Sequence, residues 1–90
     1  ELAPGEAGLL SALAYVRIRA GDFQGALRCV RRCLEADPSN VEAMVNGGIA
    51  LVKLGRLDEA GEMLERAVRT APLHPEARLN LALLYERTGR

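Results

Sequence analysis

The chain repeats itself at a single interval of 34 residues. The residues that return at this interval are Pro38 and Pro72, Gly21, Gly55 and Gly89, Ala26 and Ala60, and Asn46 and Asn80. A fixed period of this length is typical of stacked repeats, in which each unit cannot bury its apolar face alone and packs on its neighbours. The 90 residues therefore hold about two and a half copies of one structural unit.

Each copy has the pattern of two helices. Apolar residues recur at helical spacing up to Gly21, a residue type that often follows a helix, and again up to Pro38, whose ring cannot continue a helix. The same alternation predicts five helices, at residues 7–20, 23–36, 41–54, 57–70 and 75–88. Because the connections are short, consecutive helices must run antiparallel. We expect an all-α protein, a right-handed superhelical α-solenoid of antiparallel helix pairs.

The copies also predict how the chain is divided. An N-terminal extension covers residues 1–6, the first repeat covers 7–40 and the second covers 41–74. Residues 75–90 hold the first helix of a third repeat, either truncated or capping. Because the chain begins with Glu1 rather than Met, we expect a fragment of a longer protein. Its localisation stays open, with the cytoplasm favoured.

Charge and hydropathy argue against two classes of partner. The chain has 12 Lys and Arg against 12 Asp and Glu, so it lacks the positive field that holds a nucleic acid or an anionic membrane. No apolar run approaches the roughly 18 residues that cross a bilayer. We expect no nucleic-acid partner and no membrane span.

The reactive side chains do not suggest an active site. His74, the single histidine, stands in a Pro-Leu-His-Pro turn without a neighbouring nucleophile, and we expect it to be a solvated loop residue. No glycine-rich phosphate loop or paired-ligand motif occurs. Cys29 and Cys33 lie four residues apart on one predicted helix, which suits core packing better than a disulfide or a zinc site. We expect no enzyme, no cofactor and no metal site.

A glycine pair interrupts the third predicted helix. Each of Gly47 and Gly48 costs about 1 kcal/mol relative to alanine inside a helix, so something must offset that cost. Either a ligand approaches the backbone there or the helix pair packs closely. We favour close packing, because the small residues Ala14 and Ala82 occupy the position of Gly48 in the other copies.

These residues resemble the tetratricopeptide repeat family across residues 7–90. The second copy carries the family's pattern of bulky and small residues at Met44, Gly47, Gly48, Leu51, Ala60, Leu64, Ala67 and Pro72. Arg17 and Gly47 are the clearest departures. The resemblance implies a non-catalytic scaffold whose first helices line a concave groove for an extended peptide or a partner helix. It also implies that Ala26 and Ala60 are buried where paired helices cross.

One subclass of this family grips the terminal carboxylate of chaperones with a clamp of Lys, Arg and Asn side chains. The equivalent positions here are Ser11, Tyr15, Asn46, Glu76 and Asn80. Asn46 alone matches, and Glu76 would repel an anion. We do not expect a carboxylate clamp.

The predicted groove is mostly apolar instead. Carrying the family's groove positions across gives Ser11, Tyr15, Ile18, Val45, Asn46, Ile49, Val52, Leu79, Asn80 and Leu83. An exposed apolar strip of this kind normally marks a contact surface, so we expect it to take apolar side chains of a protein or peptide. Three alternatives stay open: a flanking segment fills the groove, the chain is a chaperone like the type III secretion translocator chaperones, or it is a structural slice of a longer solenoid.

The last helix suggests a second contact. Leu81, Leu84 and Tyr85 would pack on a sixth helix in a complete repeat, and here we expect them to be uncovered. We therefore predict that this face is covered by another copy of the chain, by a lattice neighbour or by residues outside the fragment, and a homodimer through this helix is one hypothesis.

Overall fold

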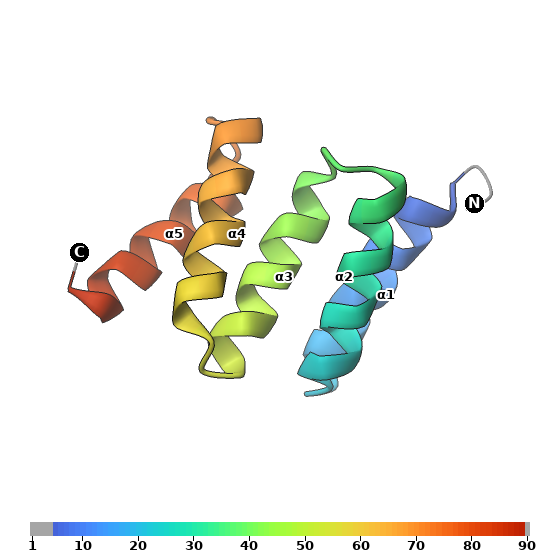
Figure 1. Ribbon diagram of the computed structural model, residues 1–90, viewed down its shortest axis with the longest axis horizontal. Helices are drawn as coiled ribbons and strands as arrows, with labels where there is room; N and C mark the ends of the chain where they lie inside the picture. The colour runs from blue at the N-terminus through green and yellow to red at the C-terminus, as the bar shows by residue number, and fades with distance from the viewer. Residues whose placement is uncertain (1–4, 90) are drawn as a thin grey trace.

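The computed structural model describes residues 5–89, which form five α-helices and no strand. The helices are α1 (Glu6–Arg19), α2 (Phe23–Ala36), α3 (Val41–Lys53), α4 (Leu57–Thr70) and α5 (Pro75–Thr88), shown in Figure 1. The predicted all-α fold is confirmed, and every helix boundary lies within one residue of its prediction. Residues 1–4 and Arg90 lie outside the described part of the chain. The last residue of the predicted N-terminal extension, Glu6, already belongs to α1.

The turn after each first helix is closed by a glycine in the left-handed conformation. At the end of α1, Gly21 has a φ of 81°. Its N–H donates to the Ile18 carbonyl, and the following Asp22 N–H donates to the Arg17 carbonyl at 2.8 Å. These two hydrogen bonds satisfy carbonyls that the helix leaves free. The left-handed backbone that they require favours a residue without a Cβ. The recurring glycine is thus a requirement of the turn that reverses the chain.

Side chains cap the first turn of α2, which follows the Gly21 turn, and of α3, which follows the Pro38 turn. The Asp22 carboxylate accepts from the Gly25 N–H at 2.9 Å, and the Asn40 side chain accepts from the Ala43 N–H at 2.9 Å. The bond to Gly25 and the ion pair with Arg17 hold the pKa of Asp22 below its usual value. Arg17 stands where the second copy has the buried Leu51, and its ion pair with Asp22 at 2.8 Å ties α1 to α2. This departure from the family pattern therefore has a structural role.

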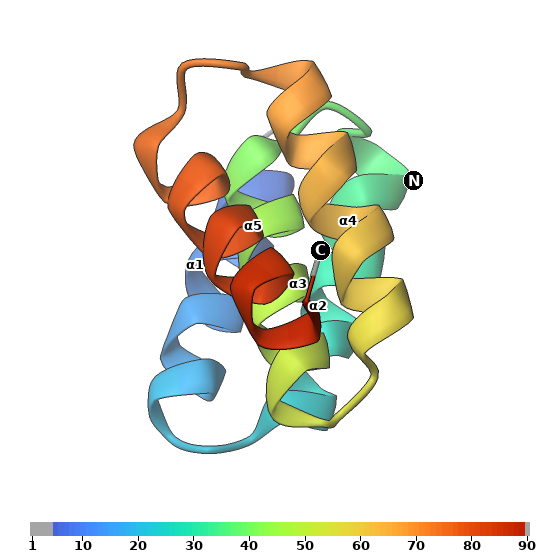
Figure 2. The same cartoon turned by 90° about the vertical axis from the view of Figure 1, so that its left-hand side faces the viewer.

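The helices stack in two layers. Figure 2 shows α1, α3 and α5 toward one side and α2 and α4 toward the other. Helix α3 contacts each of the other four helices, whereas α1 touches only α2 and α3 within the described residues. The first helices of the repeats thus share one face, as the repeat pattern predicts.

Small residues sit where the paired helices cross. Ala26 and Ala60 are completely buried, which confirms the prediction for both. Large aliphatic side chains then fill the space between layers, with Leu27, Met44 and Leu64 among the largest that are fully buried. Close approach of the backbones lets these side chains interdigitate.

The glycine pair of α3 is explained by packing. A Cβ on Gly47 would stand 2.9 Å from Val30 Cγ1, and a Cβ on Gly48 would stand 2.5 Å from Leu64 Cγ. Both distances are too short for carbon atoms, and Leu64 is itself only 1% exposed. The favoured interpretation, close helix packing, is confirmed over approach of a ligand to the backbone.

The two cysteines are core residues. Cys29 and Cys33 are free and buried, and the Cys33 thiol donates to the Ala7 carbonyl at 3.1 Å. Burial raises the pKa of the Cys33 thiol, so the neutral form that donates this bond is favoured. The described residues contain no group of His, Cys, Asp and Glu that could hold a metal ion.

The prediction of an uncovered patch on α5 is wrong for Leu84. Leu84 is only 4% exposed and Leu81 packs partly against the same apolar cluster, because both side chains lie on Leu51, Ala60 and Leu64 of the preceding helix pair. Tyr85 is half-buried, and its hydroxyl donates to Glu65 Oε2 at 2.6 Å. The argument for a homodimer through these residues loses its premise, and self-association stays an untested hypothesis.

Gly48→Ala provides a test of the helix crossing. Alanine is the better helix former, but here its methyl group would collide with Leu64, so we expect a net loss of about 1 to 3 kcal/mol in unfolding free energy. Gly8→Ala is the matched control, since a Cβ at Gly8 in α1 meets no atom within 4 Å. That variant should gain about 0.5 kcal/mol. Urea titration followed by circular dichroism measures both changes, and equal shifts in the two variants would contradict the packing explanation.

Candidate functional site: the concave face of the first helices

The face shared by α1, α3 and α5 contains two clefts. The larger, of about 530 Å³, lies between α1 and the N-terminal ends of α3 and α5. It is lined by Gly8, Ser11, Ala12, Tyr15, Val16, Asn40, Glu42, Val45, Asn46, His74 and Glu76. The smaller, of about 240 Å³, lies between the C-terminal halves of α3 and α5 and is lined by Ile49, Val52, Lys53, Leu64, Asn80, Leu83, Leu84 and Arg87. We call these the N-terminal cleft and the C-terminal cleft.

The predicted groove residues divide between the two clefts. The N-terminal cleft brings together Ser11, Tyr15, Val45 and Asn46. The C-terminal cleft brings together Ile49, Val52, Asn80 and Leu83. Leu79 lines neither cleft but is 58% exposed, and Ile18 packs against the core between α1 and α2.

The expectation that this apolar strip is exposed is wrong for Val45 and holds only in part for Ile49 and Val52. Val45 is only 3% exposed, and Ile49 packs partly against the same cluster. Val52 likewise packs against the cluster around Leu51. These residues form the floor of the groove. The side chains that stand clear of it are Tyr15, Leu79 and Leu83, each more than half exposed.

Asn46 ties the first repeat to the second beneath the N-terminal cleft. Its side-chain Nδ2 donates to the Ser11 carbonyl at 3.3 Å, and both residues are buried. The amide is therefore engaged within the protein. Its counterpart Asn80, in contrast, bonds its own helix, donating to the Glu76 carbonyl at 2.8 Å.

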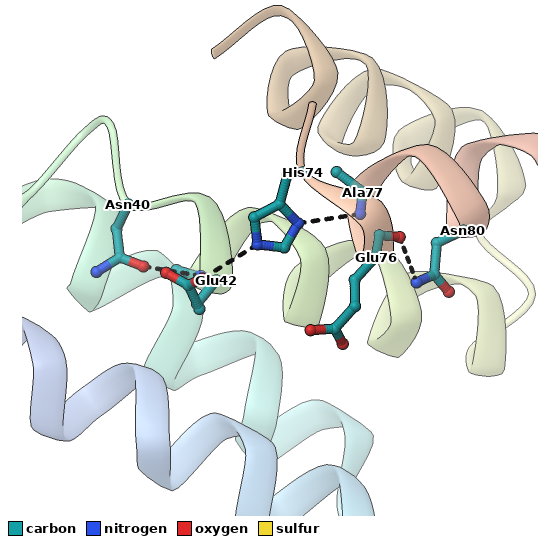
Figure 3. A network of polar contacts seen from close by, with 7 residues as sticks. Asn40, Glu42, His74, Glu76, Ala77 and Asn80 are labelled. Carbon is teal, nitrogen blue, oxygen red and sulfur yellow. Dashed lines mark hydrogen bonds and ion pairs between the residues drawn. The ribbon is translucent and has the colours of Figure 1, made fainter. Parts of the chain in front are cut away.

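His74 is a helix cap rather than a solvated loop residue, which corrects the prediction. Its Nδ1 accepts from the Ala77 N–H at 3.2 Å, and its Nε2 lies 3.2 Å from Glu42 Oε2. Figure 3 shows the imidazole between Glu42 on α3 and the first turn of α5. The two contacts together favour the neutral tautomer that carries its proton on Nε2. One ring thus begins α5 and fixes it to α3 at the rim of the N-terminal cleft.

The repeat alignment indicates the capping role of His74. His74 follows Asn40 by one repeat, and Asn40 caps α3 in the same way. Asparagine is a common N-cap residue, whereas histidine is not among the preferred ones. Aligning the two copies at this position would have identified the cap.

Removing the ring should weaken the start of α5. We expect His74→Ala to lower the unfolding free energy by about 1 kcal/mol, because the Ala77 N–H loses its acceptor. His74→Asn restores the residue of the preceding copy and should recover most of that loss. Urea denaturation measures both variants, and equal destabilisation by Ala and Asn would show that the Glu42 contact, not the cap, is what matters.

No helix of the described chain has the length and apolar character needed to cross a membrane.

The sequence matches the family model of the tetratricopeptide repeat over residues 11–69 and 45–90. A relative among curated proteins is the TPR repeat-containing thioredoxin TTL4 of Arabidopsis thaliana, which is 36% identical over 74 residues. That match covers 82% of this chain but 11% of the relative, so the chain spans only a small part of that protein's length.

Two solved structures share the fold. The second TPR domain of human RPAP3, in complex with an HSP70 peptide, superposes with a TM-score of 0.82 at 23% identity, covering 87% of this chain and 65% of that one. The type III secretion translocator chaperone SycD of Yersinia enterocolitica superposes with a TM-score of 0.89 at 17% identity, covering 99% of this chain and 67% of that one. Tetratricopeptide and other helical repeat families are generally non-catalytic. The family match, the helix pairs and the small residues at their crossings agree, and the chain belongs to the tetratricopeptide repeat family.

Proposed function

We propose that this chain is a non-catalytic protein interaction module that takes an apolar segment of a partner protein along its concave face. The observation that carries the proposal is the exposure there of three large apolar side chains. Tyr15 and Leu83 line the clefts and are 52% and 53% exposed, and Leu79, at the repeat position of Val45, is 58% exposed. Covering such side chains removes apolar surface from water at about 25 cal/mol per Å².

The floor of the face supports the same function. Val45, Ile49 and Val52 are held by packing, and the Asn46 bond to the Ser11 carbonyl fixes α1 against α3. A preformed floor spares a ligand the cost of ordering the site. The complex of the related RPAP3 domain with an HSP70 peptide is a precedent for peptide binding on this fold, and the fold likeness goes no further than that.

One alternative is favoured by a specific observation. The fold of SycD, a secretion translocator chaperone, superposes on nearly the whole chain. A chaperone of that class would use the same apolar face to shield a segment of its client. The two functions share a site, and they differ in whether the partner is folded before it binds.

The groove is tested by peptide selection followed by paired substitutions. Peptides from a random display library are selected on the immobilised protein and their affinities measured by fluorescence anisotropy. Leu83→Glu should weaken the binding of selected peptides about tenfold or more, since it replaces an apolar side chain that a bound peptide would cover with a charged one. Leu9→Glu is the control, because Leu9 is 69% exposed on α1 and lines neither cleft.

We expect the control to bind within about twofold of the unmodified protein. Circular dichroism should show equal helicity in both variants. Loss of binding in Leu9→Glu with full binding in Leu83→Glu would move the site to the outer face of α1 and overturn the proposal.

A further inference from the structure

Charged residues border the concave face in a repeating order. Position 42 of α3 and the equivalent position 76 of α5 are both glutamate. Position 53 of α3 and the equivalent position 87 of α5 are lysine and arginine. The first-helix face is thus acidic at one edge and basic at the other.

The two edges belong to the two clefts. Glu42 and Glu76 line the N-terminal cleft, and Figure 3 shows both near the His74 ring. Lys53 and Arg87 line the C-terminal cleft. All four residues are exposed, so their charges are available to a ligand.

The spacing fits a short segment. Glu42 and Lys53 are eleven residues apart on α3, as are Glu76 and Arg87 on α5. Eleven residues are close to three helical turns, so both ends face the same side at a separation of about 16 Å. An extended chain covers that distance in about five residues.

Compensation of the helix dipoles contributes to this order without accounting for all of it. Acidic residues in a first turn and basic residues in a last turn stabilise a helix. Every described helix except α2 has this order, so the dipoles account for the presence of the charges. What sets α3 and α5 apart is where their charges lie. The four charges of α3 and α5 also lie beside the clefts, where the apolar side chain of Leu83 would hold a ligand.

We propose that the concave face selects a dipolar segment, an apolar stretch of about five residues with a lysine or arginine at one end and an aspartate or glutamate at the other. This inference rests on the proposed function of the face. The basic end lies at Glu42 and Glu76, and the acidic end lies at Lys53 and Arg87. The charges therefore decide which end of the segment lies at which cleft. This holds whether the basic residue comes before or after the acidic one in the partner's sequence.

Four synthetic peptides with blocked termini and the same leucine-rich centre test this. One has lysine and glutamate at its two ends, one has glutamate at both, one has lysine at both, and one has glutamine at both. At about 0.02 M salt the lysine–glutamate peptide should bind about fivefold to tenfold tighter than the two like-charged peptides. At about 0.5 M salt the differences should shrink to less than about twofold.

Charge-swapped variants assign the two ends. The double variant Glu42→Lys, Glu76→Lys should come to prefer the peptide with two glutamates. The double variant Lys53→Glu, Arg87→Glu should come to prefer the peptide with two lysines. The control is Glu35→Lys, Glu62→Lys on the exposed surface of α2 and α4, which should leave the order of the peptides unchanged. Because Glu42 also contacts His74, the single variant Glu76→Lys is measured as well, and circular dichroism checks the fold of each.

The outcomes separate this inference from the proposed function. Equal binding of all four peptides at low salt, abolished by Leu83→Glu, would overturn the charge selection and leave the apolar groove standing. Binding of no peptide up to about 1 mM, a free energy near −4.1 kcal/mol, would overturn both. A swap of preference in the Glu35→Lys, Glu62→Lys control would place the charge effect outside the concave face and overturn the inference.

Discussion

The close approach of helix backbones at small residues is the interaction on which this structure depends. Ala26 and Ala60 leave no space at the crossings, and Gly48 lets the buried Leu64 rest directly against the backbone of α3. With the crossings so tight, the large apolar side chains at either side interdigitate, and one face of the first helices is left over. That remaining face carries both clefts. The same packing that holds the two layers together thus leaves the concave face available.

The repeat period made the architecture predictable, because turn glycines, prolines and crossing residues each follow from a local requirement that recurs in every copy. Burial at a single position did not follow, since equivalent residues have different neighbours. Val45 and Leu79 occupy one repeat position, yet Val45 is 3% exposed and Leu79 is 58% exposed. Helices flank α3 on both sides, whereas within residues 5–89 α5 has helix neighbours on one side only. Leu84 shows the opposite case: its counterpart Ala50 is completely buried, and the register alone would have predicted its burial.

The polar features of the groove were the harder part to predict. A sequence pattern gives the position of a histidine but not the direction of its ring, and His74 is defined by two bonds that leave opposite sides of the imidazole. Asn46 and Asn80 share one repeat position, yet Asn46 bonds the neighbouring helix and Asn80 bonds its own. Which acceptor an amide finds depends on the distance to the next helix. That distance is set by helix packing, and the repeat pattern of the sequence does not specify it.

The position of α3 has a consequence for how the molecule comes apart. Because α3 contacts every other helix, any opening that exposes it must first release both layers, whereas α1 and α5 can separate at one end each. The amide protons of α3 are then expected to exchange with solvent only through complete unfolding, while those of the outermost helices exchange through smaller openings. Within residues 5–89, order would be lost first at α1 and α5 and last at α3.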